Sequence, residues 1–340
     1  MQIIAPDMGF DLGSSNTLVY VKGRKIVLSE PTVVVASAQD RHIVRAVGEE
    51  AFRLMGRTTD TLIAIRPLKD GTMNDFDSTE VLVEYFIHKA IGSSRLVGPR
   101  VLVAVPSLLK SVDRRAIQEA VEVAGARKRG VYLVDKPLAA AIGSGLPVYE
   151  PTGTMVVDIG GGTTDVAVVS LGGIVVAQSI PGGGTKMDEA IVNYLKKNAS
   201  MHISPRTAED VKIDLGSAMP QTNLRRIRIR GRDLLSAHAM DVEFTSAQAY
   251  EALKDVCAAI LGAIHWVLER TPPELAADIM RTGIYLTGGG SQLFALDQYI
   301  ATNLGIPVLL AREPEDATVT GLGYLIEHED LFEAITRRSN

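Results

Sequence analysis

Cysteine is almost absent from this chain of 340 residues, which contains Cys257 alone. A single thiol excludes an intramolecular disulfide and fits a reducing, cytosolic compartment. Cys257 lies in an apolar pattern of helical spacing, so we interpret it as part of a core. The six histidines are scattered without the spacing of metal ligands, and they give no support to a histidine-based metal centre.

Long apolar runs and several catalytic signatures are also missing. No uninterrupted apolar segment is long enough to span a bilayer, and the first residues lack the basic region and apolar core of a signal peptide. Neither a Walker A sequence nor the G-x-S-x-G of a serine hydrolase occurs. The formal net charge of −5 argues against a nucleic-acid partner. Hydrophobic residues make up 46% of the chain, which is ordinary for a globular protein with sizeable cores.

Glycine, in contrast, is concentrated in loops, and one of these lies at 155–169. An apolar run leads into Asp158, three glycines and two threonines follow, and a second apolar run begins. The β-branched runs predict a hairpin of two buried strands. Because glycine has no side chain, such a loop can aim several backbone N–H groups at one anion, and an adjacent Asp can hold Mg²⁺ through water. The loop therefore indicates phosphate and magnesium, although a plain glycine-rich turn explains the same pattern.

The same loop occurs a second time near the start of the chain. The run FDLGSSNTLVYV at 10–21 aligns without a gap on VDIGGGTTDVAV at 157–168, so that Asp11 matches Asp158. The offset of 147 residues is the size of a typical domain. A third glycine loop, TGGGS, lies at 287–291. We expect two similar lobes whose hairpins clamp a polyphosphate from both sides, with the nucleoside held by the third loop.

Strands and helices alternate along the chain. Apolar and β-branched runs predict strands at 18–21, 26–28, 32–36, 101–105, 131–134, 174–179, 284–286 and 307–310. Helical spacing predicts helices at 78–91, 110–124, 186–197, 248–269 and 293–303, and a last helix from about residue 318. This alternation indicates an α/β fold with open sheets, whose ligands bind at the carboxyl ends of strands.

In combination these motifs are specific. The paired hairpins, DKPLAAA at 135–141 and TGGG at 287–290 resemble the phosphate, connecting and adenosine motifs of the actin/Hsp70/sugar-kinase superfamily. Within it, AIRPLKDG at 64–71, NDFD at 74–77 and VKIDLGSA at 211–218 are similar to the bacterial actin homologues MreB and Mbl. The resemblance runs from about residue 8 to residue 328.

The resemblance implies a duplicated actin-like, ribonuclease H-like fold with a nucleotide in the central cleft. The first lobe would span 1–145 with an insertion subdomain at about 33–65, and the second 146–317 with an insertion at about 182–246. Residues 318–340 would form a C-terminal helix that returns to the first lobe. ATP and Mg²⁺ are the implied cofactors, and the implied function is a filament-forming cytoskeletal protein that directs cell-wall synthesis and rod shape.

The resemblance also implies roles for individual residues. Asp11 and Asp158 would hold Mg²⁺, and the catalytic group would be Asp158, Thr163, Asp135 and Lys136. The nucleotide-binding residues would be Gly13, Ser14, Ser15, Asn16, Gly160, Gly161, Gly162, Thr163, Gly182, Gly183, Glu209, Asp210, Val211, Lys212, Gly288, Gly289, Gly290 and Ser291. From spacing alone, Glu209 and Lys212 would instead form an exposed ion pair on one helix.

Lys136 departs from the family pattern. Relatives usually carry Glu at this place, before the proline of the connecting motif, where its carboxylate positions the attacking water. A protonated lysine has no acceptor for a proton of that water. We expect Pro137 to be the first helical residue, which keeps Lys136 outside the helix. We hypothesise weak hydrolysis with Lys136 on the γ-phosphate, unless Asp135 replaces the missing base. Alternatively, Lys136 points to solvent and Asp135 or Asp158 suffices.

Leu96 and Val97 form an apolar pair between Arg95 and Arg100. In relatives a hydrophobic loop at this place enters the membrane, whereas from sequence alone 94–100 is a loop tip before the next strand. The resemblance thus implies three partners: further copies of the chain in filaments, the inner-membrane lipid surface, and membrane proteins of cell-wall elongation. The implied location is cytoplasmic, peripheral on the inner face of the cell membrane.

Two other kinds of protein in the superfamily have the same pair of glycine hairpins. A monomeric sugar or acetate kinase would use it to transfer phosphate, but no acid beside a sugar pocket is evident and the insertions are small. A chaperone nucleotide-binding domain would be followed by a peptide-binding domain, and the short stretch after residue 328 is too small for one.

Overall fold

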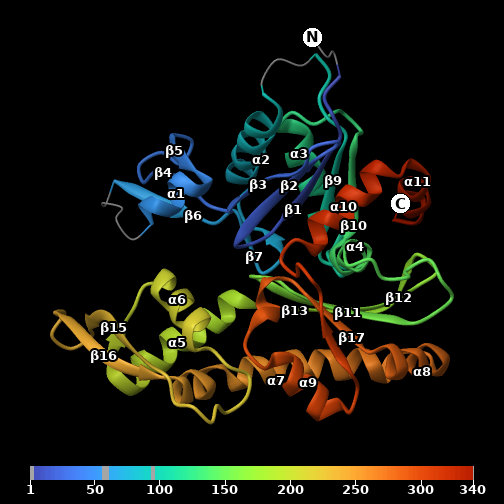
Figure 1. The fold of residues 1–340 in the computed structure, drawn as a ribbon. Helices are drawn as coiled ribbons and strands as arrows, with labels where there is room; N and C mark the ends of the chain where they lie inside the picture. The colour runs from blue at the N-terminus through green and yellow to red at the C-terminus, as the bar shows by residue number, and fades with distance from the viewer. Residues whose placement is uncertain (1–3, 56–60, 93–95, 340) are drawn as a thin grey trace.

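Two five-stranded sheets form the centres of two lobes. A computed structural model describes residues 4–55, 61–92 and 96–339, and the statements below concern these parts of the chain. In Figure 1 the sheet of the N-terminal strands lies above the sheet of the later strands. The upper sheet contains β1 (Met8–Leu12), β2 (Asn16–Val21), β3 (Lys25–Pro31), β9 (Val101–Val105) and β10 (Val131–Asp135). The lower sheet contains β11 (Thr154–Ile159), β12 (Thr163–Ser170), β13 (Gly173–Pro181), β17 (Ile284–Thr287) and β18 (Val308–Leu310).

Both sheets have the same topology. The strand orders are β3-β2-β1-β9-β10 and β13-β12-β11-β17-β18. In each sheet the first three strands are antiparallel neighbours, and the last two run parallel to the first. The gapless match between 10–21 and 157–168 falls on the hairpins β1–β2 and β11–β12. The predicted duplicated fold is therefore confirmed.

Helices cover both faces of the upper sheet. α2 (Phe76–Ile91) and α3 (Ser111–Val123) pack on one face, and α4 (Lys136–Gly143), α10 (Ala317–Glu327) and α11 (Glu329–Ser339) on the other. Alternate residues of β9 point to opposite faces of the sheet. Val103 packs in the apolar cluster of α2 and α3, whereas Leu102 packs in that of α4 and α10. A strand buried on both sides needs the continuous apolar run that the sequence shows here.

The lower sheet rests on α7 (Ser246–Arg270), the helix predicted at 248–269. It begins at a capping box, in which the Thr245 hydroxyl and the Gln248 side chain each accept the other residue's backbone N–H. Cys257 is fully buried on its apolar face, as expected for a core thiol, and burial raises its pKa to about 12. α8 (Pro273–Thr282), which was not predicted, and α9 (Leu296–Leu304) follow.

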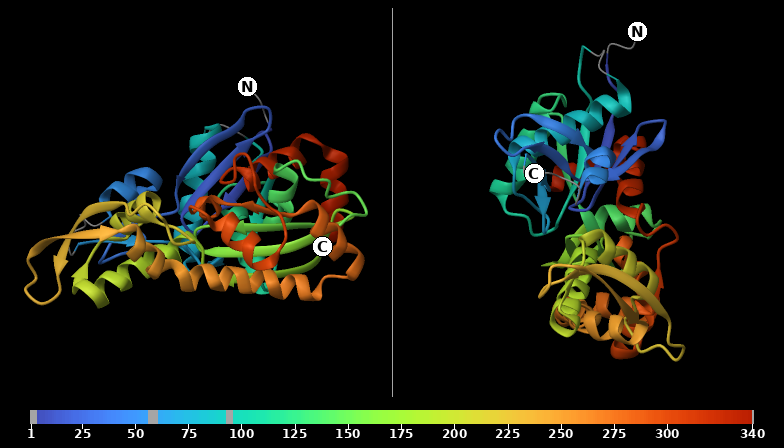
Figure 2. Two further views of the ribbon diagram at one scale, coloured as in Figure 1. Left: turned by 60° about the horizontal axis from the view of Figure 1, so that its bottom comes forward. Right: turned by 90° about the vertical axis from the view of Figure 1, so that its left-hand side faces the viewer.

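Each lobe carries a small extension at the same end of the molecule (Figure 2). The upper one contains β4 (Val34–Ser37), β5 (Val44–Val47), α1 (Gly48–Leu54) and β6 (Leu62–Ile65), followed by the short hairpin of β7 (Leu68–Lys69) and β8 (Thr72–Met73). The lower one contains α5 (Gly184–Ala199), β14 (Met201–His202), α6 (Pro205–Leu215), β15 (Arg226–Asp233) and β16 (Ala239–Thr245).

α4 and α10 connect the lobes through a common apolar cluster. Residues of the upper sheet, such as Leu102, and of the lower sheet, such as Val156, belong to this cluster together with both helices. The helices touch backbone to backbone, because a Cβ at Gly321 would lie 2.7 Å from the carbonyl carbon of Ala139. Glycine is therefore required where the helices cross.

Two predictions at helix ends are wrong. Lys136 is the first residue of α4, because Asp135 takes the extended N-cap conformation instead. The single C-terminal helix expected from residue 318 is divided into α10 and α11, because the chain leaves helical geometry at His328 (φ −120°, ψ 90°). Arg100 then holds α11 against the first lobe, since its guanidinium group pairs with Glu329 at 2.5 Å and with Asp7 at 2.8 Å.

The apolar pair at 96–97 lies at the N-terminal side of β9. Leu96 is 80% exposed, whereas Val97 is half-buried and forms a bridge with Ile4. The flanking residues Ser94 and Arg95 lie outside the described residues. Across the described ranges, no helix combines the length and the apolar character needed to cross a bilayer.

Candidate functional site

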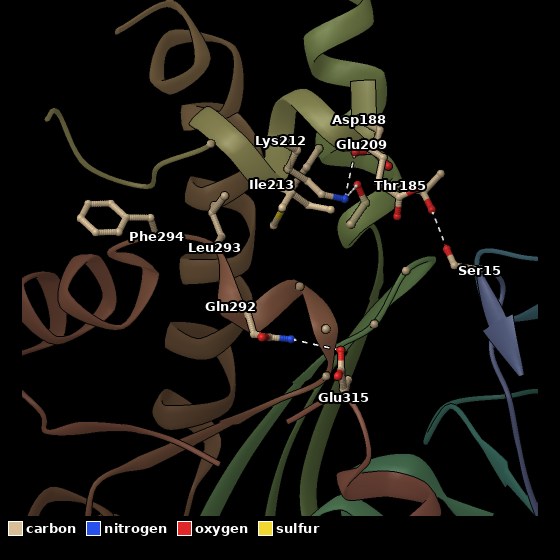
Figure 3. Close-up of a pocket in the computed structure, with 18 of the residues that line it drawn as sticks. Ser15, Thr185, Asp188, Glu209, Lys212, Ile213, Gln292, Leu293, Phe294 and Glu315 are labelled. Atoms are coloured by element: carbon tan, nitrogen blue, oxygen red, sulfur yellow. Dashed lines mark hydrogen bonds and ion pairs between the residues drawn. The ribbon is translucent and has the colours of Figure 1, made fainter. Parts of the chain in front are cut away.

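A cavity of about 1110 Å³ lies between the lobes, where β1 and β11 end. It is enclosed by both glycine hairpins, the third glycine loop, α5 and α6 (Figure 3). The predicted residues that line it are Asp11, Gly13, Ser15, Asn16, Lys136, Asp158, Gly160, Gly161, Glu209, Lys212, Gly288, Gly289 and Gly290. Residues far apart in the sequence are thus brought together at the carboxyl ends of strands, where open α/β sheets bind ligands.

Other predicted residues lie beside the cavity rather than on its surface: Ser14, Asp135, Gly162, Thr163, Gly182, Gly183, Asp210, Val211 and Ser291. Several of them support the lining. Val211 lies on the buried face of α6 and packs in the core of the lower lobe. The Ser291 hydroxyl donates to the carbonyl of Gly288 at 2.6 Å. The Gly182 N–H donates to the carbonyl of Gly162 at 2.9 Å, which holds β13 against the second hairpin.

The two hairpins touch each other across one wall of the cavity. A Cβ at Gly161 would lie 2.7 Å from Cβ of Ser15, and a Cβ at Gly162 would lie 2.8 Å from Cβ of Ser14. Ser15 and Thr185 share a hydroxyl hydrogen bond of 3.3 Å between the lobes. Only glycine permits this approach, so the glycines at 161 and 162 let the backbones of both lobes face the same space.

The third glycine loop is packed against the second hairpin. Gly288 has a φ of +78°, and a Cβ there would lie 2.6 Å from Oδ1 of Asp158. The neighbouring Thr287 hydroxyl donates to the same carboxylate at 3.3 Å. The loop continues into a short 3₁₀ helix, η1 (Gly289–Gln292). Asp158 is therefore held in place by the loop that forms the far wall of the cavity.

α5 and α6 contribute an ion pair to the cavity. Lys212 Nζ lies 2.9 Å from Oδ1 of Asp188 and donates to the carbonyl of Gly184 at 3.3 Å (Figure 3). Helical spacing alone predicts a pair between Glu209 and Lys212, but the ammonium group is bound to Asp188. Burial raises the pKa of Asp188 to about 6, and the nearby Lys212 opposes this shift. Asp188 and Thr185 were not predicted, although both lie near the start of α5, directly after a glycine loop.

The other end of the cavity is apolar. Ile213 and Phe294 are 73% and 61% exposed, and with Leu293 they line the cavity beyond the third glycine loop. Large exposed apolar side chains beside a polar loop favour a flat, partly apolar ligand group. The cavity thus has a polar end with backbone N–H groups and an apolar end suited to a nucleobase.

Comparison with known proteins decides the family. A family model described as "MreB/Mbl protein" matches residues 5–334. The cell shape-determining protein Mbl of Bacillus subtilis (strain 168) is 45% identical over 328 residues, which cover 96% of this chain and 98% of Mbl. The cell shape-determining protein MreB of Escherichia coli (strain K12) is 46% identical over 330 residues, which cover 96% of this chain and 94% of MreB. The chain belongs to the MreB/Mbl family.

Solved structures of MreB proteins share the fold. MreB5 of Spiroplasma citri, in crystal structures bound to AMPPNP and to ADP, superposes with a TM-score of 0.90 at 30% sequence identity. The match covers 98% of this chain and 99% of MreB5. A MamK structure, solved as a double helical filament, superposes with a TM-score of 0.78 at 21% identity over 94% of this chain and 98% of MamK. The fold of this MreB/Mbl chain is therefore actin-like.

Lys136 of this MreB/Mbl chain is turned into the site. Its Nζ lies 2.7 Å from Oδ1 of Asp11, and its side chain is only 10% exposed. Burial lowers the pKa of Lys136, but the charges of Asp11, Asp158 and Asp165 outweigh burial and raise it. The lysine thus stays protonated, and the alternative in which it points to solvent is wrong. The ion pair also offsets the unfavourable placement of a cation at the start of α4.

Asp135, the candidate replacement base, is engaged elsewhere. Its carboxylate pairs with Arg114 of α3 at 2.5 Å, and it lies beside the cavity rather than on its surface. Burial raises the pKa of Asp135, while Arg114 opposes the shift. Within the ion pair its oxygens face a guanidinium group, whereas the carboxylate of Asp158 lines the cavity. Burial raises the pKa of Asp158 to about 7, with Lys136 opposing the shift.

Two carboxylates at the floor of the cavity, Asp11 and Asp158, lie where the resemblance to the family implies magnesium. Mg²⁺ is commonly held by one or two carboxylates together with phosphate oxygens and water, and Asp11 and Asp158 supply that number. However, the Asp11 oxygen is already bound by the ammonium group of Lys136. Among the described residues, no group of three acidic, histidine or cysteine side chains forms a metal cluster. As they stand, these residues do not fit Mg²⁺.

Proposed function

We propose that this MreB/Mbl chain is an ATP-dependent, actin-like filament protein of the cell-shape cytoskeleton. The contact between the two glycine hairpins across one cavity carries the proposal. A triphosphate between them would accept hydrogen bonds from both lobes, so that the bound nucleotide fixes how the lobes sit relative to each other. Filament contacts repeat from copy to copy and require one fixed lobe arrangement, which links ATP to assembly. The nucleotide-bound MreB5 structures support ATP as the ligand.

The residues that line the cavity support one arrangement of ATP. The phosphates would lie on Ser15, Gly160 and Gly161, which line the polar end of the cavity. The base would pack on the apolar end beside Ile213 and Phe294. The ribose would then lie between them, near α6 with Glu209 and Lys212 and near the third glycine loop.

Light scattering of the purified chain tests assembly and hydrolysis together. We expect scattering to rise on addition of ATP or AMPPNP and to stay at baseline without nucleotide. In the same samples we expect slow phosphate release, because Lys136 has no acceptor for a proton of the attacking water. Lys136→Glu should release phosphate faster, by about 10²-fold or more, because a positioned base contributes about 10²–10⁴ to the rate. A chain that stays monomeric with ATP and phosphorylates a sugar or acetate would instead be a kinase.

We further propose that filaments bind the inner face of the cell membrane and guide membrane proteins of cell-wall elongation. The exposed Leu96 supports this, with Val97 half-buried beside it. One side chain of this size gives weak binding, about 1.5–3 kcal/mol if fully buried, but a filament multiplies it. Pelleting with anionic liposomes should recover the wild type in ATP and lose the Leu96→Ser/Val97→Ser variant. Equal pelleting of both would exclude this loop as the anchor.

A further inference from the structure

The ion pair between Lys136 and Asp11 lies where an actin-like site would place its metal. Asp11 and Asp158 are the next-to-last residues of the equivalent strands β1 and β11, so both carboxylates reach the floor of the cavity. Lys136 Nζ lies 2.7 Å from Oδ1 of Asp11, and both side chains are largely buried. A cation that belongs to the chain itself is thus already bound to one of the two carboxylates.

The surroundings of this ammonium group are negatively charged. The negative charges of Asp158 and Asp165, both almost fully buried, attract the ammonium group of Lys136 in addition to that of Asp11. The other lysine that lines the cavity, Lys212, is bound to Asp188 at its far side. Lys136 is therefore the cation that balances the carboxylates at the phosphate end of the cavity.

We propose that the ammonium group of Lys136 takes the place of Mg²⁺ beside Asp11, so that this chain binds nucleoside triphosphates with little dependence on Mg²⁺. The inference rests on the proposed function, because a triphosphate must enter the cavity. An ammonium group has three N–H donors, so one can stay on Asp11 while another reaches a phosphate oxygen. Lys136 thereby bridges carboxylate and phosphate from within the chain.

The same geometry disfavours a divalent ion at Asp11. Mg²⁺ that approached this carboxylate would meet the ammonium group a few ångströms away, and like charges repel strongly in a partly buried site. The lysine would have to leave Asp11 and become unpaired among buried groups, which is costly. Added Mg²⁺ therefore has little to contribute to the affinity for ATP.

Titration calorimetry with ATP, in excess MgCl₂ and in EDTA, tests the inference on the wild-type chain. We expect the two dissociation constants to agree within about fivefold. Lys136→Met, which keeps most of the unbranched side chain but removes the ammonium group, should bind ATP about 10- to 100-fold more weakly in EDTA, the size of one lost charged hydrogen bond. Mg²⁺ should restore most of that loss in the variant, because Asp11 is then free to bind the metal.

Lys212→Met is the matched control, because it removes the other lysine of the cavity. It should weaken ATP binding by a similar factor in MgCl₂ and in EDTA. ATP-induced shifts in melting temperature provide a second readout for each variant and show that it is folded. Wild-type binding that is lost in EDTA overturns the inference and leaves the proposed function intact. Absence of ATP binding in both buffers overturns the proposed function as well.

Discussion

Gly161→Ala is expected to weaken ATP binding by about 100-fold while the chain stays folded, because the lobes lose two or more charged hydrogen bonds to one ligand. The added Cβ would lie 2.7 Å from Cβ of Ser15 and overlap its hydroxyl oxygen. Carbon atoms separated by less than about 3.5 Å repel each other, so the two hairpins must move apart. Each lobe keeps its own core. The change therefore affects the contact between the two glycine hairpins rather than the fold of either lobe.

The chain offers a direct rescue of this variant. Ser15→Gly removes both atoms that the new Cβ would meet, and the next obstacle, the backbone nitrogen of Ser15, lies at an acceptable 3.5 Å. The double variant should thus bind ATP as well as Ser15→Gly alone. Calorimetry on the two single variants, the double variant and the wild type gives the coupling energy between the positions. If Gly161→Ala binds ATP like the wild type, the hairpins do not close on the ligand.

The duplicated architecture could be predicted because its signals are local. Each hairpin carries its apolar alternation, its glycines and its Asp within a dozen residues, so the match between β1–β2 and β11–β12 was visible without any tertiary information. The same is true of α7, whose capping box and apolar stripe are read within one helix. Local consistency of this kind is what makes an element predictable.

The partners of charged side chains could not be predicted in the same way. Lys136 and Asp11 are distant in the chain and meet only because the fold brings the start of α4 close to the end of β1. Likewise, Lys212 selects Asp188 on a neighbouring helix over Glu209 on its own. The break at His328 was missed because no glycine or proline marks it there, and α11 is held in place by Arg100 from another part of the lobe. Each of these choices is made by tertiary packing.

Gly321→Ala is expected to destabilise the chain by about 3 kcal/mol, at the upper end of the usual cost of overpacking. The new Cβ would overlap the carbonyl oxygen of Ala139 and lie 2.7 Å from its carbon. Backbone atoms cannot change rotamer, so α4 and α10 must separate along their whole crossing. Because α4 begins at Lys136, the separation would also shift the ammonium group beside Asp11.

Gly262→Ala separates this packing effect from the general effect of alanine in a helix. Gly262 lies in the interior of α7, is exposed, and has no atom within 4 Å of the position of a Cβ. Alanine there should stabilise the chain by about 0.5–1 kcal/mol, because it restricts the unfolded backbone and favours the helix. Melting curves of both variants should therefore shift in opposite directions from the wild type. A Gly321→Ala chain that melts at or above the wild-type temperature would show that the two helices are free to move apart, and the lobes would then be joined more loosely than their shared apolar cluster indicates.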